Sequence, residues 1–146
     1  MATTRSERSF DGVGGIRIVY DVWTPNTEPL GVVILCHGFG EHARRYDHVA
    51  QRFGEGGLIT YALDQRGHGR SGGKRVFLKN ISEYTDDFHH LVGIATAAHP
   101  SSSAWSSATA WAAVSCSPTA SSIPDDYAAM VLSGPAVYAQ DGVSPR

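Results

Sequence analysis

The stretch Val32-Val33-Ile34-Leu35-Cys36-His37-Gly38-Phe39-Gly40-Glu41-His42 decides how this chain folds. Its first five residues form a continuous apolar run, which is typical of a parallel strand buried on both faces of a sheet. The run ends at His37, and the two glycines that follow let the backbone turn sharply and a ligand approach closely. Such a turn can point a backbone N–H at an oxyanion. The alternative is a plain strand-to-helix turn without a chemical role.

Strands and helices alternate on both sides of this stretch. Apolar runs and alternating β-branched or aromatic residues indicate strands, and apolar residues at helical spacing indicate helices. This order implies an α/β fold with a mostly parallel sheet and helices on both faces. Ser82 is the expected cap of the second helix. The predicted strands are 16–23, 32–36, 58–63 and 129–132, and the predicted helices are 45–53 and 81–98.

Length and composition place the chain among single-domain globular proteins. It has 146 residues and a net charge of −2, with both signs interspersed, so no basic face is expected and nucleic acid is not a predicted partner. The two cysteines, Cys36 and Cys116, are not expected to pair, which favours a reducing, cytoplasmic compartment. The longest apolar run is far too short to span a bilayer. No motif calls for a metal or a cofactor.

A second motif, Asp64-Gln65-Arg66-Gly67-His68-Gly69-Arg70-Ser71-Gly72, directly follows the predicted strand 58–63. Together the two motifs resemble the α/β-hydrolase superfamily. The longer string from His37 to Tyr46 resembles the monoacylglycerol lipases and the lysophospholipase-like group around them. The resemblance covers residues from about Arg8 to Pro100 and again from Pro124 to about Val143.

The resemblance implies a serine hydrolase that cleaves carboxylic esters of glycerol lipids without a cofactor. In this family the residue at Phe39 gives one backbone N–H to the oxyanion hole, and the residue at Trp111 gives the second. Arg66 and His68 match a loop that is mainly structural. A cap segment later in the family's chain implies peripheral membrane contact. The substrate-binding positions that the resemblance implies are His37, Gly38, Gly40, Glu41 and Arg45.

The slot of the nucleophile holds Ala110. The family's elbow, Gly-x-Ser-x-Gly, places a serine on a tight turn between a strand and a helix. Counted from Pro100, that serine falls at position 110, where alanine has no atom that can attack a carbonyl. Ala108 and Ala112 replace the two elbow glycines. Ser71 matches the pattern literally, but it belongs to the second motif and is predicted to be structural.

The nucleophile slot lies within an anomalous tract, residues 101–123, that is rich in Ser and Ala and contains no charge, Gly or Leu. GC-rich codons for Leu-Gly-His-Ser-Met-Gly-Gly, read one nucleotide late, give the residues from Ser107 to Ala112. The tract therefore suggests that a frameshift has replaced the sequence of the elbow strand and helix. The alternative is a natural Ser/Ala-rich linker. Because hydroxyls stand where branched aliphatics belong, weak order is expected over the whole tract.

The sequence thus predicts one α/β-hydrolase domain over residues 1–146, truncated before the cap and the C-terminal strands. The family's catalytic acid and histidine follow the nucleophile in chain order, and the chain stops at Arg146. No catalytic residue is therefore expected intact, and the chain is predicted to be inactive. Two alternatives stay open. One is another α/β-hydrolase, such as an epoxide hydrolase or dehalogenase with an aspartate nucleophile, and the other is a non-catalytic lipid-binding fragment.

Overall fold

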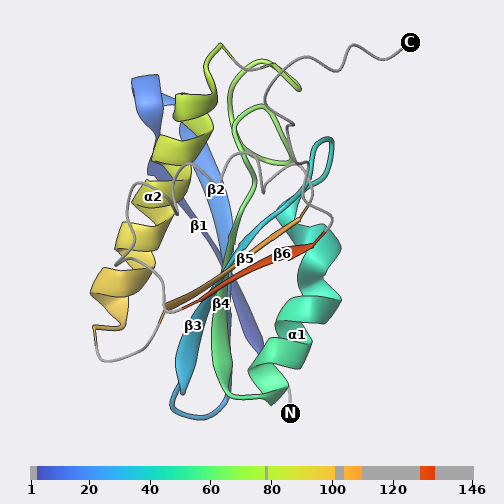
Figure 1. The fold of residues 1–146 in the computed structure, drawn as a ribbon, viewed down its shortest axis with the longest axis vertical. Helices are drawn as coiled ribbons and strands as arrows, with labels where there is room; N and C mark the ends of the chain where they lie inside the picture. Colours follow the sequence, from blue (N-terminus) through green and yellow to red (C-terminus); the bar gives the residue numbers. More distant parts are fainter. Residues whose placement is uncertain (1–2, 78, 101–103, 110–128, 134–146) are drawn as a thin grey trace, which may run out of the picture.

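The fold, seen in a computed structural model, is a mixed six-stranded sheet with a helix on each face (Figure 1). The structure describes residues 3–77, 79–100, 104–109 and 129–133. The strands follow the order β1-β2-β4-β3-β5-β6 across the sheet. They are β1 (Thr4–Asp11), β2 (Arg17–Thr24), β3 (Gly31–Cys36), β4 (Leu58–Leu63), β5 (Ala104–Thr109) and β6 (Ala129–Ser133). The helices are η1 (Val13–Gly15), η2 (Ala43–Tyr46), α1 (Asp47–Glu55) and α2 (Ile81–Ala98).

The apolar runs that the sequence marks as strands form the middle of the sheet. Every residue of β3 is buried, and so is every residue of β4 after Leu58. Successive side chains point to opposite faces, which divides the core in two. Ile34 and Tyr61 belong to the cluster under α2, whereas Leu35 and Ala62 belong to the cluster under α1. Figure 1 shows the two helices on opposite sides of the sheet.

The helices match the predicted periodicity, but the cap of α2 and the start of the first helix differ from the prediction. The apolar stripe of α2 is buried as expected. Its cap is Asn80 rather than Ser82, because the Asn80 side-chain oxygen accepts a hydrogen bond from the Ser82 N–H at 3.2 Å. The first helix is split, since the 3₁₀ turn η2 precedes α1. The buried residues of the α2 stripe are Tyr84, Phe88, Leu91, Val92 and Ala95.

The sheet gains an N-terminal strand that the sequence analysis did not predict. β1 is largely polar and exposed, and it pairs with β2 in antiparallel fashion over its whole length, from Thr4↔Thr24 to Asp11↔Arg17. β2 is also antiparallel to β4, whereas β4-β3, β3-β5 and β5-β6 are parallel. The sheet is therefore mixed, with its parallel part around β3.

Part of the anomalous tract forms β5, which lies between β3 and β6. Its register pairs Val32 with Ala104 and Cys36 with Ala108. The structure therefore places residues 104–109 of this tract, over which weak order is expected, in a strand of the sheet. Main-chain hydrogen bonds hold a strand regardless of its side chains, so a Ser/Ala-rich strand can occupy the central slot. Residues 101–103 and 110–123, including Ala110 and Trp111, lie outside the described residues.

Candidate active site

The carboxyl ends of β3, β4 and β5 meet at one edge of the sheet, because these neighbouring strands are parallel. The chain leaves β3 towards β4 on one side and returns through α2 to β5 on the other side. The change of direction makes the gap between β3 and β5 a topological switch point. In open α/β sheets, ligands bind outside the carboxyl ends of the strands at such a point. The candidate site is this edge, where the loop after β3 and the end of β5 lie side by side.

His37 fixes the start of the loop that follows β3. Its ring is fully buried, its Nδ1 lies 2.7 Å from the Gly38 carbonyl oxygen, and its Nε2 accepts the Gln65 N–H at 3.0 Å. These partners require a neutral ring with the proton on Nδ1. Burial lowers the pKa of His37 from 6.5 to about 4. The Gln65 side-chain amide also donates to the His37 carbonyl oxygen at 2.6 Å, which ties the ends of β3 and β4 together.

Glu41 closes the same loop from the other end. Its carboxylate accepts the Gly38 N–H at 3.1 Å and the Tyr46 hydroxyl at 2.5 Å, and it pairs with Arg45 at 2.9 Å. Burial would raise the pKa of Glu41, but the hydrogen bonds from Tyr46 and Gly38 and the charge of Arg45 outweigh it, so the pKa is lowered. The expected substrate residues Glu41 and Arg45 thus lie together at one end of the loop.

Gly40 and Phe39 form the tip of the loop. Gly40 has a φ of +73°, a backbone conformation that favours glycine. Phe39 is 55% exposed, and its ring meets the His68 ring edge-on with the centroids 6.1 Å apart. The loop is therefore anchored at both ends and presents its tip at the sheet edge. All five expected substrate-binding residues and Phe39 come together here, whereas Ala110 and Trp111 lie outside the described residues.

Asp64 organises the second motif. Its buried carboxylate accepts the Ala43 N–H at 2.6 Å, the Arg70 N–H at 2.9 Å and the Arg70 Nε–H at 2.7 Å. Burial would raise the pKa of Asp64, but the hydrogen bonds from Arg70 and Ala43 outweigh it and lower the pKa. A Cβ on Gly69 would come within 2.4 Å of this carboxylate. The Asp64 carboxylate therefore links the β4 end to both neighbouring loops.

Ser71 has a structural role. Its side chain is buried, and its hydroxyl accepts the Val19 N–H at 2.8 Å and donates to the Asp64 carbonyl oxygen at 2.5 Å. Both the proton and a lone pair are used within the core, so the hydroxyl is not poised to attack a substrate. The literal match to Gly-x-Ser-x-Gly at Ser71 therefore marks a tie between β2 and the end of β4.

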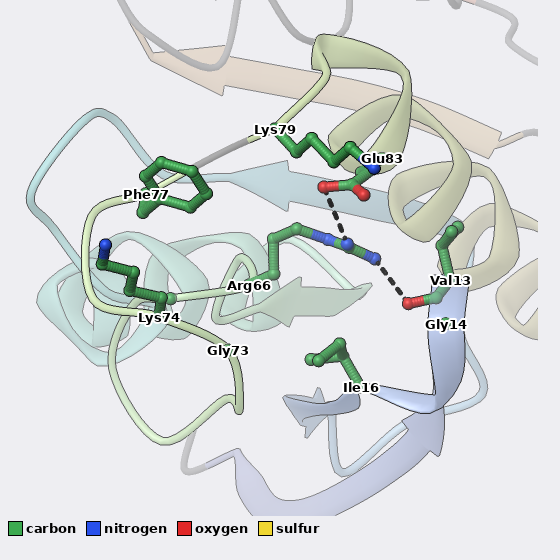
Figure 2. Close-up of a pocket in the computed structure, with 10 residues that line it drawn as sticks. Val13, Gly14, Ile16, Arg66, Gly73, Lys74, Phe77, Lys79 and Glu83 are labelled. Atoms are coloured by element: carbon green, nitrogen blue, oxygen red, sulfur yellow. Dashed lines mark hydrogen bonds and ion pairs between the residues drawn. The ribbon is translucent and has the colours of Figure 1, made fainter.

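Arg66 braces the α2 helix against the β1–β2 connection. Its side chain is 8% exposed and pairs with Asp87 at 2.7 Å and Glu83 at 3.1 Å. Its third contact is the Val13 carbonyl oxygen at 3.1 Å. Figure 2 shows the guanidinium spanning from Glu83 to Val13. The guanidinium is therefore used within the protein, as the structural interpretation of this motif predicts.

The carboxylates that complete these networks were missed by the sequence analysis. Asp21 lies in β2 with no exposed side-chain surface and pairs with Arg70 at 2.8 Å, and Glu7 in β1 pairs with the same arginine at 2.8 Å. Asp87 stands on the buried face of α2. An acidic residue inside an apolar stripe indicates a buried ion pair or hydrogen bond, because a buried carboxylate needs a partner. Asp21 was hidden because its strand alternates like an ordinary amphipathic one.

Neither a metal site nor a membrane span is found in the part of the chain that the structure describes. No group of three His, Cys, Asp or Glu side chains is placed there to hold a metal ion. Among these residues, no helix combines the length and the apolar character that crossing a bilayer requires.

Known proteins share this architecture and sequence. The profile of the serine aminopeptidase S33 family matches residues 27–146. A monoacylglycerol lipase of Mycolicibacterium smegmatis is 59% identical over 145 residues, which cover 99% of this chain and 52% of the relative. The chain thus spans about half the length of that relative.

Solved structures give the same result. A thermostable carboxyl esterase from Bacillus coagulans, in complex with glycerol, superposes with a TM-score of 0.79 at 26% identity, over 90% of this chain and 44% of the esterase. Epoxide hydrolase A from Mycobacterium thermoresistibile superposes with a TM-score of 0.71 at 28% identity, over 88% of this chain and 39% of the hydrolase. The predicted α/β-hydrolase fold is therefore confirmed. The chain belongs to the serine aminopeptidase S33 family of α/β-hydrolases, within its monoacylglycerol lipase-like group.

Proposed function

We propose that this chain carries the scaffold of a serine esterase for glycerol-lipid esters and is itself inactive, because Ala110 fills the nucleophile slot. The observation that carries the proposal is the register of β5. Cys36 pairs with Ala108 in parallel strands. β5 therefore ends at the same edge where His37 and Phe39 follow β3, and position 110 is the next residue in the sequence.

The placement suits acyl transfer. In this reaction a serine hydroxyl attacks the ester carbonyl, and backbone N–H groups stabilise the negative charge that develops on the oxygen. The loop through Phe39 supplies one such N–H in the proposal, and position 111 supplies the other. The bonds of His37 and Glu41 to the loop support this role, because the oxyanion donors must be held in place before the reaction.

The substrate class in the proposal is a monoacylglycerol or a similar small lipid ester. The identity to the Mycolicibacterium smegmatis monoacylglycerol lipase supports it, as does the likeness to an esterase in complex with glycerol. Epoxide hydrolysis would need an aspartate at the elbow, and Ala110 removes this nucleophile as well.

The low cysteine content, two in 146 residues, supports the proposed cytoplasmic location.

Labelling with a fluorophosphonate probe tests the proposal. The probe forms a covalent adduct with an activated serine, so intact-mass analysis of the chain is expected to show no adduct. The Mycolicibacterium smegmatis relative serves as the positive control under the same conditions. An adduct on this chain, mapped to one serine by peptide sequencing, would show that an activated nucleophile exists and would contradict the proposal.

A further inference from the structure

The connection between β4 and α2 carries an exposed cluster that the proposed function does not use. We name residues 74–77 and 79 the basic loop. We propose that the basic loop docks the candidate-site edge of the sheet onto a bilayer that contains anionic phospholipid. Its two described apolar side chains, Val76 and Phe77, are 49% and 52% exposed. The proposal concerns binding to a lipid surface and does not depend on turnover.

The charge of the basic loop complements an anionic surface. It contains Lys74, Arg75 and Lys79, and the sequence has no acidic residue between Asp64 and Glu83. Among the described residues, the ion pairs of the protein involve none of these three cations. The whole chain has a net charge of −2, so the positive charge is local. Cations near an anionic leaflet are attracted to it and lose this attraction beyond about a Debye length.

Val76 stands at a strained backbone position. Its φ is +51°, and no other non-glycine residue in the described part of the chain has a positive φ. A β-branched residue in this region is a true outlier. The Val76 N–H donates to the Gly67 carbonyl oxygen at 3.1 Å, and the Phe77 N–H donates to the Lys74 carbonyl oxygen at 3.2 Å, which holds the turn. The fold thus sustains strain to present two apolar side chains to the outside, and such strain concentrates at functional sites.

A pocket lies beside the basic loop. It has a volume of about 290 Å³ and is lined by Phe77, Lys74 and Lys79 together with Ile16 and Arg66 (Figure 2). The Arg66 guanidinium is already neutralised by Glu83, so the two lysines supply the positive charge that remains. Lys74 Nζ lies 4.7 Å from the centroid of the Phe77 ring. Ammonium groups beside an aromatic ring suit the boundary between phosphate headgroups and acyl chains.

Docking through the basic loop would bring the candidate site to the surface of the bilayer. The basic loop follows the carboxyl end of β4, the neighbour of β3, so it belongs to the same edge of the sheet as the candidate site (Figure 1). A bilayer against this edge would present lipid esters to the loop through Phe39. The docking element is therefore the β4–α2 connection, distinct from the cap segment that the family resemblance implies.

Vesicle flotation tests the proposal with the full chain. Binding is expected to vesicles of phosphatidylcholine with one quarter phosphatidylglycerol, and to weaken as NaCl screens the charges. Lys74→Gln/Lys79→Gln should lower the partition coefficient about 30-fold, which corresponds to about 1 kcal/mol for each cation. Arg8→Gln/Arg52→Gln is the matched control, since it removes the same charge from exposed side chains elsewhere and should leave binding within about twofold.

The apolar part is tested by a second pair of variants. Phe77→Ser should lower partitioning about tenfold. Leu30→Ser should not, because Leu30 is 79% exposed but precedes β3 at the opposite edge. Val76→Gly should raise the thermal midpoint while it weakens vesicle binding, a combination that a purely structural turn would not give. Circular dichroism of each variant confirms its fold. Absence of binding by the wild-type chain, equal binding to neutral vesicles, or equal losses in the loop and control variants would overturn the proposal.

Discussion

Replacing Arg66 by Met should destabilise the protein strongly, although Arg66 belongs to a motif of an enzyme family. The Arg66 side chain is 8% exposed and its main partner Asp87 only 1%, so the pair is shielded from water. Removing the cation leaves the Asp87 carboxylate buried, and among the described residues its remaining hydrogen bond comes from the Val13 N–H at 2.9 Å. Breaking a buried pair in this way costs about 3–5 kcal/mol. A loss of this size is a large part of the 5–15 kcal/mol that is typical of a domain.

Urea unfolding followed by circular dichroism measures this loss. Arg52→Met is the control, because the Arg52–Glu55 pair is exposed on α1 and should contribute less than about 1 kcal/mol. The double variant Arg66→Met/Asp87→Leu should recover most of the lost stability, because no unpaired carboxylate stays buried. An Arg66→Met variant within about 1 kcal/mol of wild type would refute the structural role assigned to Arg66 and reopen a role in binding.

Three further predictions concern the candidate site and its gene. The pKa of His37 is lowered from 6.5 in the unfolded chain to about 4 in the folded chain. The unfolded chain therefore binds the proton first as the pH falls, and the free energy of unfolding should decrease by about 3 kcal/mol from pH 7 to pH 4. This slope should be largely missing in His37→Gln, and an unchanged slope would contradict the burial argument. Gly69→Ala should lower the thermal midpoint more than Gly14→Ala, because only the former forces a Cβ against Asp64. Equal effects would show that the contact is not tight. Sequencing of the coding DNA should reveal compensating shifts near codons 101 and 123, whereas an in-frame alignment with relatives would exclude a frameshift.

The buried strands and the second helix could be predicted from local pattern alone. β4 and α2 have the expected bounds, and β3 begins one residue earlier than expected. The residues of these elements are enough to indicate them, because buried strands need apolar runs and α2 needs an apolar stripe. β1 lacks such a run, because an edge strand with exposed side chains needs only main-chain partners. β1 depends on pairing with β2, and the residues of β1 alone do not indicate this partner.

The candidate site was predictable where one loop carries it. Residues 37–41 and 45 come together because they are close in sequence and directly follow a buried strand. The network of Asp64, Arg70, Asp21 and Glu7 could not be foreseen, because it joins residues up to 63 positions apart. Pairings of this kind depend on the strand order, and the antiparallel β1 and β2 that supply the two carboxylates lie outside the predicted parallel pattern.

The rate at which the folded chain hydrolyses a monoacylglycerol tests the central claim most directly. The measurement should be made beside the Mycolicibacterium smegmatis relative at equal protein concentration, with the fold of both confirmed by circular dichroism. Because position 110, the next residue in sequence after the strand that pairs with β3, is an alanine, the chain should release fatty acid at the rate of the protein-free control. Release well above this control, proportional to the concentration of the chain, would contradict the claim that the nucleophile slot is empty.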